Sequence, residues 1–133
     1  MQARQLQNDF DTECKSMPEL ININYSCEFT PTKLTATIES LENDKRAIVE
    51  FYNIQGFRVL DEGDLMEFWT FDSRPKGWLW EINKGGWFDL EIQRESSLTL
   101  KLLTSRNKEY LIAGSGKCLN IICENEPKVT MIN

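Results

Sequence analysis

Residues Ile21-Asn-Ile-Asn-Tyr-Ser-Cys-Glu-Phe29 decide the fold class, because apolar and polar side chains alternate along them. Successive side chains of a β-strand point to opposite faces, so this period of two predicts a strand with one buried face. The residues that follow, Thr30-Pro-Thr32, predict a turn, since proline fixes its own φ and lacks an amide hydrogen. The stretch therefore predicts a strand of an antiparallel sheet, followed by a tight reversal.

The same alternation recurs through much of the chain. Further strand-like runs, rich in β-branched and aromatic residues, occupy 34–38, 47–54, 57–60, 78–83, 98–102, 110–113, 118–123 and 129–132. The pattern of a long amphipathic helix is absent, which disfavours a doubly wound α/β fold. We predict a mainly β to α+β fold: a curved or sandwich-like antiparallel sheet of many short strands, with one to three short helices.

Some segments are less regular. Residues 1–17 are polar and nearly aperiodic, which predicts an N-terminal arm or short helix ahead of a single β-rich domain over 18–133. Gly56 predicts a bend or bulge. Asp64 and Glu67 have the spacing of a helix N-cap and its reciprocal acid, which favours a short helix over 64–70. Residues 87–95 fit either a returning strand or a short helix.

The composition narrows the function. The chain has 133 residues, a net charge of −6 and no histidine. An acidic chain disfavours direct nucleic-acid binding, which needs clustered lysine and arginine, and favours a basic protein partner. Histidine usually supplies the base that activates a serine or cysteine nucleophile. We therefore expect a protein that is not an enzyme and has no catalytic residues.

The cysteines and the apolar runs bear on metals and on the compartment. Cys14, Cys27, Cys118 and Cys123 show no CxxC spacing, so we expect neither a metal site nor a cofactor. No apolar run approaches the roughly 20 residues of a membrane span, and the first residues lack the apolar core of a signal peptide. We expect a cytoplasmic protein with free thiols and no membrane association. Two disulfides in a secreted form are the alternative.

An acidic cluster follows the strand-like run 57–60. It contains Asp61, Glu62 and Asp64, and its sequence lacks the 12-residue pattern of an EF-hand calcium loop. We predict that these three carboxylates bind a partner, although Asp64 also fits a helix start. A carboxylate-based glycoside hydrolase is a minor alternative, since two facing acids suffice for that chemistry.

Tryptophans are concentrated between residues 69 and 87. Trp78 and Trp80 share one face of a predicted strand, and Trp87 follows a Gly-Gly break. Aromatic residues bury large areas and are mostly core, but tryptophan is also enriched at the centres of protein interfaces. Both interpretations stay open here, and we take Trp78, Trp80 and Trp87 as candidate partner-binding residues.

Three blocks of the chain resemble a known class of bacterial proteins. The blocks are Phe57-Arg-Val-Leu-Asp-Glu-Gly-Asp-Leu65 with Trp69, the segment 78–87, and Tyr110-Leu-Ile-Ala113 with Cys118-Leu-Asn-Ile-Ile-Cys123 and Glu126-Pro-Lys-Val129. Over residues 47–130 this layout is similar to the small cytoplasmic immunity proteins of polymorphic toxin and contact-dependent growth-inhibition systems.

That resemblance implies a non-enzymatic protein that binds and neutralises a cognate toxin domain. The implied toxin is basic, and a nuclease is one example of such a domain. Carboxylates would pair with its lysines and arginines, while aromatic side chains would anchor the contact. We expect a monomer or weak dimer. The alternative function is a β-rich module that binds a sugar or lipid through the clustered tryptophans.

Overall fold

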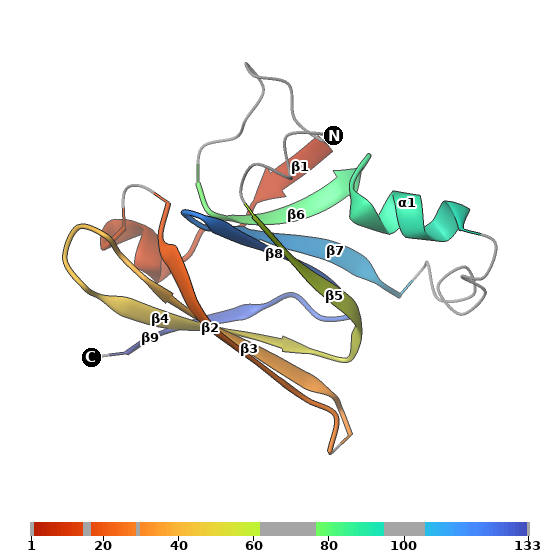
Figure 1. Ribbon diagram of the computed structural model, residues 1–133, viewed down its shortest axis with the longest axis horizontal. Coiled ribbons are helices and arrows are strands. Elements are labelled where there is room, and N and C mark those ends of the chain that lie inside the picture. The colour runs from red at the N-terminus through yellow and green to blue at the C-terminus, as the bar shows by residue number, and fades with distance from the viewer. Residues whose placement is uncertain (1, 15–16, 29, 62–76, 95–105, 133) are drawn as a thin grey trace.

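The chain folds into two antiparallel sheets, seen in a computed structural model that describes residues 2–14, 17–28, 30–61, 77–94 and 106–132 (Figure 1). The described part contains one α-helix, α1 (Trp87–Gln93), and one 3-10 helix, η1 (Asp9–Thr12). Its strands are β1 (Gln2–Gln5), β2 (Glu19–Ser26), β3 (Lys33–Glu39), β4 (Arg46–Tyr52), β5 (Ile54–Asp61), β6 (Leu79–Lys84), β7 (Lys108–Ala113), β8 (Lys117–Cys123) and β9 (Lys128–Ile132).

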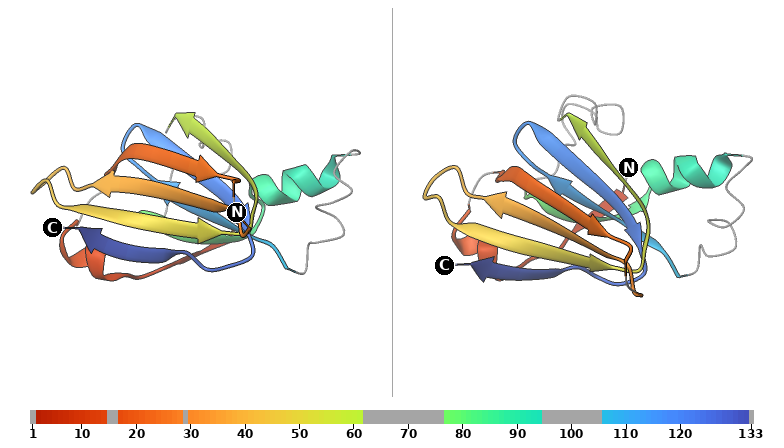
Figure 2. Two further views of the ribbon diagram at one scale, coloured as in Figure 1. Left: turned by 90° about the horizontal axis from the view of Figure 1, so that it is seen from below. Right: turned by 60° about the horizontal axis from the view of Figure 1, so that its bottom comes forward.

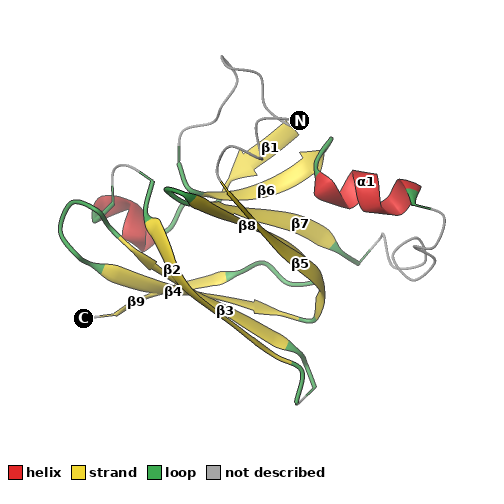
Figure 3. Cartoon of the chain, viewed as in Figure 1, coloured by secondary structure: helices red, strands yellow, loops and turns green. Residues whose placement is uncertain are grey.

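The strands form a five-stranded sheet in the order β1-β6-β7-β8-β5 and a four-stranded sheet in the order β2-β3-β4-β9. The two sheets form the two layers of a sandwich, and α1 extends beyond one end of the five-stranded sheet (Figures 2 and 3). The predicted mainly β, sandwich-like architecture of short antiparallel strands is confirmed, and residues 87–93 are helix rather than strand.

The core lies between the facing surfaces of the two sheets. Alternating residues of β3 and β4 point inward and are fully buried against alternating residues of β7 and β8. Phe51 of β4 meets Tyr110 of β7 with their ring centroids 6.2 Å apart. The alternation visible in the sequence is therefore the pattern of a half-buried sheet, with polar side chains on the outer face of the four-stranded sheet.

The chain crosses from one sheet to the other at Asn53, between β4 and β5. Asn53 has a φ of +58°, a left-handed conformation that asparagine tolerates better than most residues. Its amide donates to the carbonyl of Thr32, and its side chain contacts that of Asn125. Just beyond it, the pairing with β8 shifts register between Ile54 and Gly56, so the bulge predicted at Gly56 is present.

The N-terminal segment, predicted as an arm or short helix, contains the short 3-10 helix η1 and packs onto the rest of the domain. Residues 2–5 pair with β6, and Phe10 of η1 is fully buried in the main core. Phe10 meets Trp78 edge-on, and the Trp78 indole nitrogen donates to Asp11 at 3.0 Å. Polar composition suggested an arm, but a few well-placed apolar residues are enough to fix the segment to the domain.

Two further expectations need correction along β2. The pairing with β3 shifts register between Leu20 and Asn22, so Ile21 lies in a bulge and is exposed instead of sharing the buried face of Ile23. Cys27 lies just after the strand and is also exposed. The predicted helix over 64–70 and the predicted strand over 98–102 lie outside the described residues.

Phe10→Ala tests whether the N-terminal segment belongs to the core. Removing a large buried aromatic side chain leaves a cavity, so we expect the free energy of unfolding to fall by about 3–5 kcal/mol in urea denaturation. Gln7→Ala, at an exposed position of the same segment, should change it by less than about 0.5 kcal/mol. A loss below about 1 kcal/mol for Phe10→Ala would mean that the segment is dispensable.

Candidate functional site

The helix α1 begins at a carboxylate supplied by a neighbouring strand. Gly86, its N-cap, has no side chain to cap the helix, and Glu109 of β7 accepts a hydrogen bond from the Phe88 amide at 2.8 Å instead. A Cβ atom on Gly86 would lie 2.6 Å from the Glu109 carboxylate, so the close approach requires glycine. A helix N-terminus favours negative charge, and Glu109 therefore fixes where α1 starts.

Glu109 is the first member of a polar network on the outer face of the five-stranded sheet. Its second carboxylate oxygen accepts a hydrogen bond from the Asn120 side chain at 2.8 Å. The Asn120 oxygen accepts from Arg58 of β5 at 3.3 Å, and the Arg58 guanidinium lies 5.1 Å from the centre of the Trp87 ring. Trp87 in turn donates to Glu91 at 3.1 Å. The network thus connects three strands to the helix.

The environment of Glu109 changes its ionisation. The residue is only 1% exposed, and this burial raises the pKa of its carboxyl group above the ordinary glutamate value. The hydrogen bonds from Phe88 and Asn120 and the charge of Arg58 act in the opposite direction but do not cancel the effect of burial.

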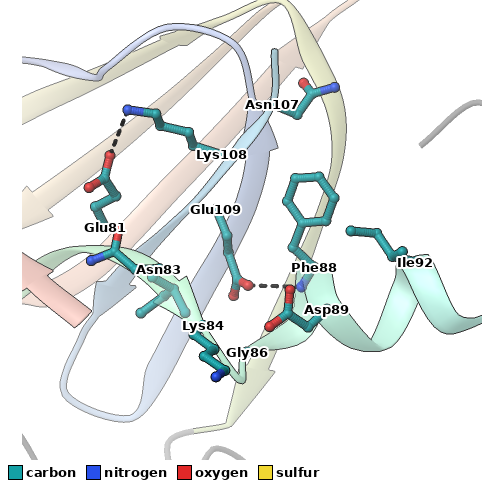
Figure 4. A pocket seen from close by; sticks show the side chains of 11 residues that line it. Glu81, Asn83, Lys84, Gly86, Phe88, Asp89, Ile92, Asn107, Lys108 and Glu109 are labelled. Atoms are coloured by element: carbon teal, nitrogen blue, oxygen red, sulfur yellow. Dashed lines mark hydrogen bonds and ion pairs between the residues drawn. The ribbon is translucent and has the colours of Figure 1, made fainter. Parts of the chain in front are cut away.

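A pocket of about 370 Å³ lies beside this network, between α1 and the ends of β6 and β7 (Figure 4). Its lining is mixed, with Ile82, Phe88 and Ile92 as its apolar part. The polar lining comes from Glu81, Asn83, Lys84, Asp89, Asn107, Lys108 and Glu109. This volume is near the small end of the range for ligand sites, which is roughly 300–1,000 Å³.

The carboxylates of this pocket already have partners. Glu81 pairs with Arg4 at 3.2 Å and with Lys108 at 3.3 Å. Burial raises the pKa of Glu81, but the hydrogen bonds and charges of these two cations outweigh it, so the pKa lies below its usual value. Asp89 accepts a hydrogen bond from the Gly85 amide at 2.6 Å. These contacts hold the helix and the strand ends in place.

The sequence-predicted carboxylates are only partly within the described structure. Asp61 ends β5 and pairs with Lys117 of β8. The two side chains are 66% and 58% exposed, so this ion pair lies on the surface, where such pairs contribute little to stability. Glu62 and Asp64 lie outside the described residues. Asp61 is thus accessible to a partner, with a cation beside it.

Two of the three candidate tryptophans are in the interior. Trp78 is 1% exposed and lies between η1 and the sheets, while Trp80 is 7% exposed on the other face of its sheet. A partner-binding role for Trp78 and Trp80 does not fit this burial, and the core interpretation replaces it. Trp87 is half-buried beside Arg58. None of the three lines the pocket, so the pocket does not match a tryptophan-lined sugar or lipid site.

An acidic surface that no sequence pattern indicated lies at the opposite end of the molecule. Here η1 and the β3–β4 turn lie together, near the end of β9 (Figures 1 and 2). The side chains of Ser40 and Asn43 both donate to the Glu13 carbonyl, at 3.2 and 3.0 Å, and hold the two segments together. We call the resulting surface the acidic end and define it by Leu41 and the carboxylates of Asp9, Asp11, Glu13, Glu42 and Asp44.

The acidic end combines charge with exposed apolar surface. Leu41 is 56% exposed, the highest value among the large hydrophobic residues of the described segments. Met131 and Ile132 of β9 are also exposed, and Ile132 pairs in register with Arg46, just after the turn. Lys45 is the one cation within residues 8–14 and 40–45. Some 30 residues separate the two acidic segments, so no local pattern could have joined them.

Comparison with protein-family models, curated proteins and solved structures finds no significant match. The described residues contain no group of three or more histidine, cysteine, aspartate or glutamate side chains arranged to hold a metal ion. No helix within the described ranges has the length and apolar character needed to cross a membrane.

Glu109→Gln tests the ionisation of the buried carboxylate. The folded-state pKa is raised, so ionisation of Glu109 opposes folding. We compare the free energy of unfolding of the unmodified chain with that of the variant. This difference should fall as pH rises from the ordinary glutamate pKa through the raised pKa, and it should be constant at higher pH. Urea denaturation of both proteins between about pH 4 and pH 8 measures this difference.

Glu50→Gln provides a control of opposite sign. Hydrogen bonds from Tyr52 and Lys33 lower the pKa of Glu50, so its contribution to stability should be lost as pH falls through that lowered value. The free energy of unfolding of the unmodified chain, minus that of Glu50→Gln, should therefore rise with pH. If the same difference for Glu109→Gln also rose with pH, the assigned role of Glu109 would be contradicted.

Proposed function

We propose that this chain is a non-enzymatic immunity protein that binds a basic toxin domain and neutralises it by direct contact. The observation that carries the proposal is the acidic end, where two segments that hydrogen bonds hold together carry five carboxylates and the exposed Leu41. Protein interfaces commonly place an apolar anchor at their centre and charged groups around it. The acidic end carries both kinds of group on neighbouring segments.

Charge complementarity supports a basic partner. The chain carries a net charge of −6, and the five carboxylates of the acidic end outnumber the two cations at the end of the turn, Lys45 and Arg46. Such a field speeds the encounter with a basic surface and disfavours acidic partners. A nuclease domain fits this chemistry, because it needs a basic surface for its own substrate. Carboxylates bound there would occupy the place of nucleic-acid phosphates and block substrate access.

The acidic end is also firmly held, which favours binding without large rearrangement. The Asp11 carboxylate accepts hydrogen bonds from the Trp78 indole and from the Asn8 amide, both at 3.0 Å. The Asn43 side chain bridges the turn to the backbone and carboxylate of Glu13. A preorganised surface loses less conformational entropy when it binds.

Charge reversal should identify the interface. The triple variant Asp9→Lys, Glu42→Lys, Asp44→Lys should slow association with a cognate basic toxin domain, to be sought among the products of neighbouring genes, by about tenfold or more. Added salt should affect its on-rate less. Surface plasmon resonance measures both quantities. Toxin-induced growth arrest, which the unmodified protein should relieve, gives the functional readout.

Two comparison variants make this experiment specific. Glu124→Lys, Glu126→Lys reverses exposed carboxylates of the β8–β9 loop and should leave the on-rate nearly unchanged. Asp61→Lys, Glu62→Lys, Asp64→Lys tests the surface that the sequence predicted. If only the variant at residues 61, 62 and 64 slowed association, the interface would lie at the end of β5 instead. No binding or rescue by the unmodified protein would refute the function itself.

Leu41→Ala tests the apolar anchor. A side chain at the centre of an interface typically contributes more than 1 kcal/mol, so we expect the dissociation constant to rise about fivefold or more, mainly through faster dissociation. Leu90→Ala is the matched control, since Leu90 is 50% exposed on α1. Equal effects of the two substitutions would mean that Leu41 has no special role.

A further inference from the structure

The two sheets have four edge strands in the described part of the chain, and three of them have features that oppose further pairing. The strand β1 is four residues long and includes Arg4. The strand β5 has a bulge near Gly56 and carries Arg58 and Asp61. The strand β9 begins with Lys128 and lies against η1. Short length, charges, bulges and covering elements are the usual protection of a sheet edge.

The fourth edge strand, β2, lacks this protection along its second half. The bulge is confined to residues 20–22, and from Asn22 to Ser26 the strand pairs with β3 in continuous register. These five residues, Asn-Ile-Asn-Tyr-Ser, include no charge, proline or glycine. Every second residue of an antiparallel edge strand directs its N–H and C=O away from its neighbour. In the sheets as described, no strand pairs with that side of β2.

We propose that a second copy of this chain pairs antiparallel with this edge, with a twofold axis at Asn24. In that register Asn22 lies opposite Ser26 of the other copy, and Ile23 lies opposite Tyr25. A β-branched residue facing an aromatic one is a favourable cross-strand pair, and the amide and hydroxyl groups on the outer face can hydrogen-bond to one another. The interface would join two four-stranded sheets into one continuous sheet.

Charge explains why a second copy fits this edge. Two chains with a net charge of −6 repel each other, and a neutral surface adds no local repulsion where they meet. The segment Asn22–Ser26 is such a surface, and it is self-complementary about its centre. Asn24, Tyr25 and Ser26 are exposed. Tyr25 also contacts Phe57 of β5, with ring centroids 5.1 Å apart, which supports the strand from the core side.

The small area of the paired strands and the repulsion between the chains both limit the strength of the association. Pairing of five residues buries far less surface than a standard protein interface, so the dimer should dissociate in the micromolar range or above. Salt screens the repulsion between the two acidic chains and should strengthen the dimer. Binding of a basic toxin, in contrast, should weaken with salt, so the two associations are distinguishable.

Analytical ultracentrifugation over a range up to about 0.3 mM tests the proposal, since this covers weak interfaces. The unmodified chain should dimerise reversibly, and Asn24→Lys should raise the dimer dissociation constant about tenfold or more, because two ammonium groups meet at the twofold axis. Thr130→Lys is the matched control, with the same charge change on the same sheet face at the other edge. It should leave the dimer intact or strengthen it by reducing the net charge.

A covalent trap gives an independent readout. Directly opposed residues of antiparallel strands have Cα atoms about 4.5–5.5 Å apart, within the range that a disulfide spans. Asn24→Cys, with the exposed Cys27 replaced by serine, should therefore cross-link into a dimer on mild oxidation. Thr130→Cys in the same background should not.

Three outcomes would contradict the proposed dimer. Monomer at every concentration, a dimer insensitive to Asn24→Lys, or cross-linking through position 130 alone would each overturn the proposal. Circular dichroism confirms that each variant is folded. Hydrogen exchange should show new protection over residues 22–26 as the concentration increases, and protection elsewhere alone would also contradict the proposed register.

Discussion

The apolar layer between the two sheets is the interaction on which the rest of the structure depends. It forms because β3, β4, β7 and β8 each present alternate apolar side chains to the same interior. Burial of such surface is the main favourable contribution to folding, while hydrogen bonding within the sheets satisfies the backbone. The ends of this layer must also be covered from solvent, and Phe10 and Trp78, which pack against each other, cover one of them.

The functional surfaces follow from this arrangement. Packing of Trp78 against η1 brings the N-terminal carboxylates beside the β3–β4 turn, so the acidic end is a by-product of how the core is closed. At the far end of the five-stranded sheet, the buried Glu109 holds α1 through its backbone amides rather than through apolar contact alone. A buried carboxylate is costly unless its oxygens are satisfied, and here both accept hydrogen bonds.

The sequence was sufficient for the fold class and insufficient for the site. Period-two alternation revealed the sandwich-like architecture, and Gly56 revealed a bulge, because both are local signals. Which strands pair is a long-range matter, and no pattern indicated that Asn8–Glu13 would meet the turn at Ser40–Lys45. Burial of Trp78 depends on its contact with η1, which no local sequence pattern indicates. A single β-bulge also moved Ile21 out of the face that alternation had assigned to it.

The pairing of β1 with β6 has a consequence for how the chain folds. The ion pair between Arg4 and Glu81 joins residues 77 positions apart, so this contact closes a very long loop. Closing such a loop costs conformational entropy, and contacts this distant in sequence slow folding when they are numerous. Until β1 arrives, β6 is itself an open edge. Pairing with β1 covers the edge that β6 would otherwise leave open, which makes the first few residues a protection against edge-to-edge misassembly.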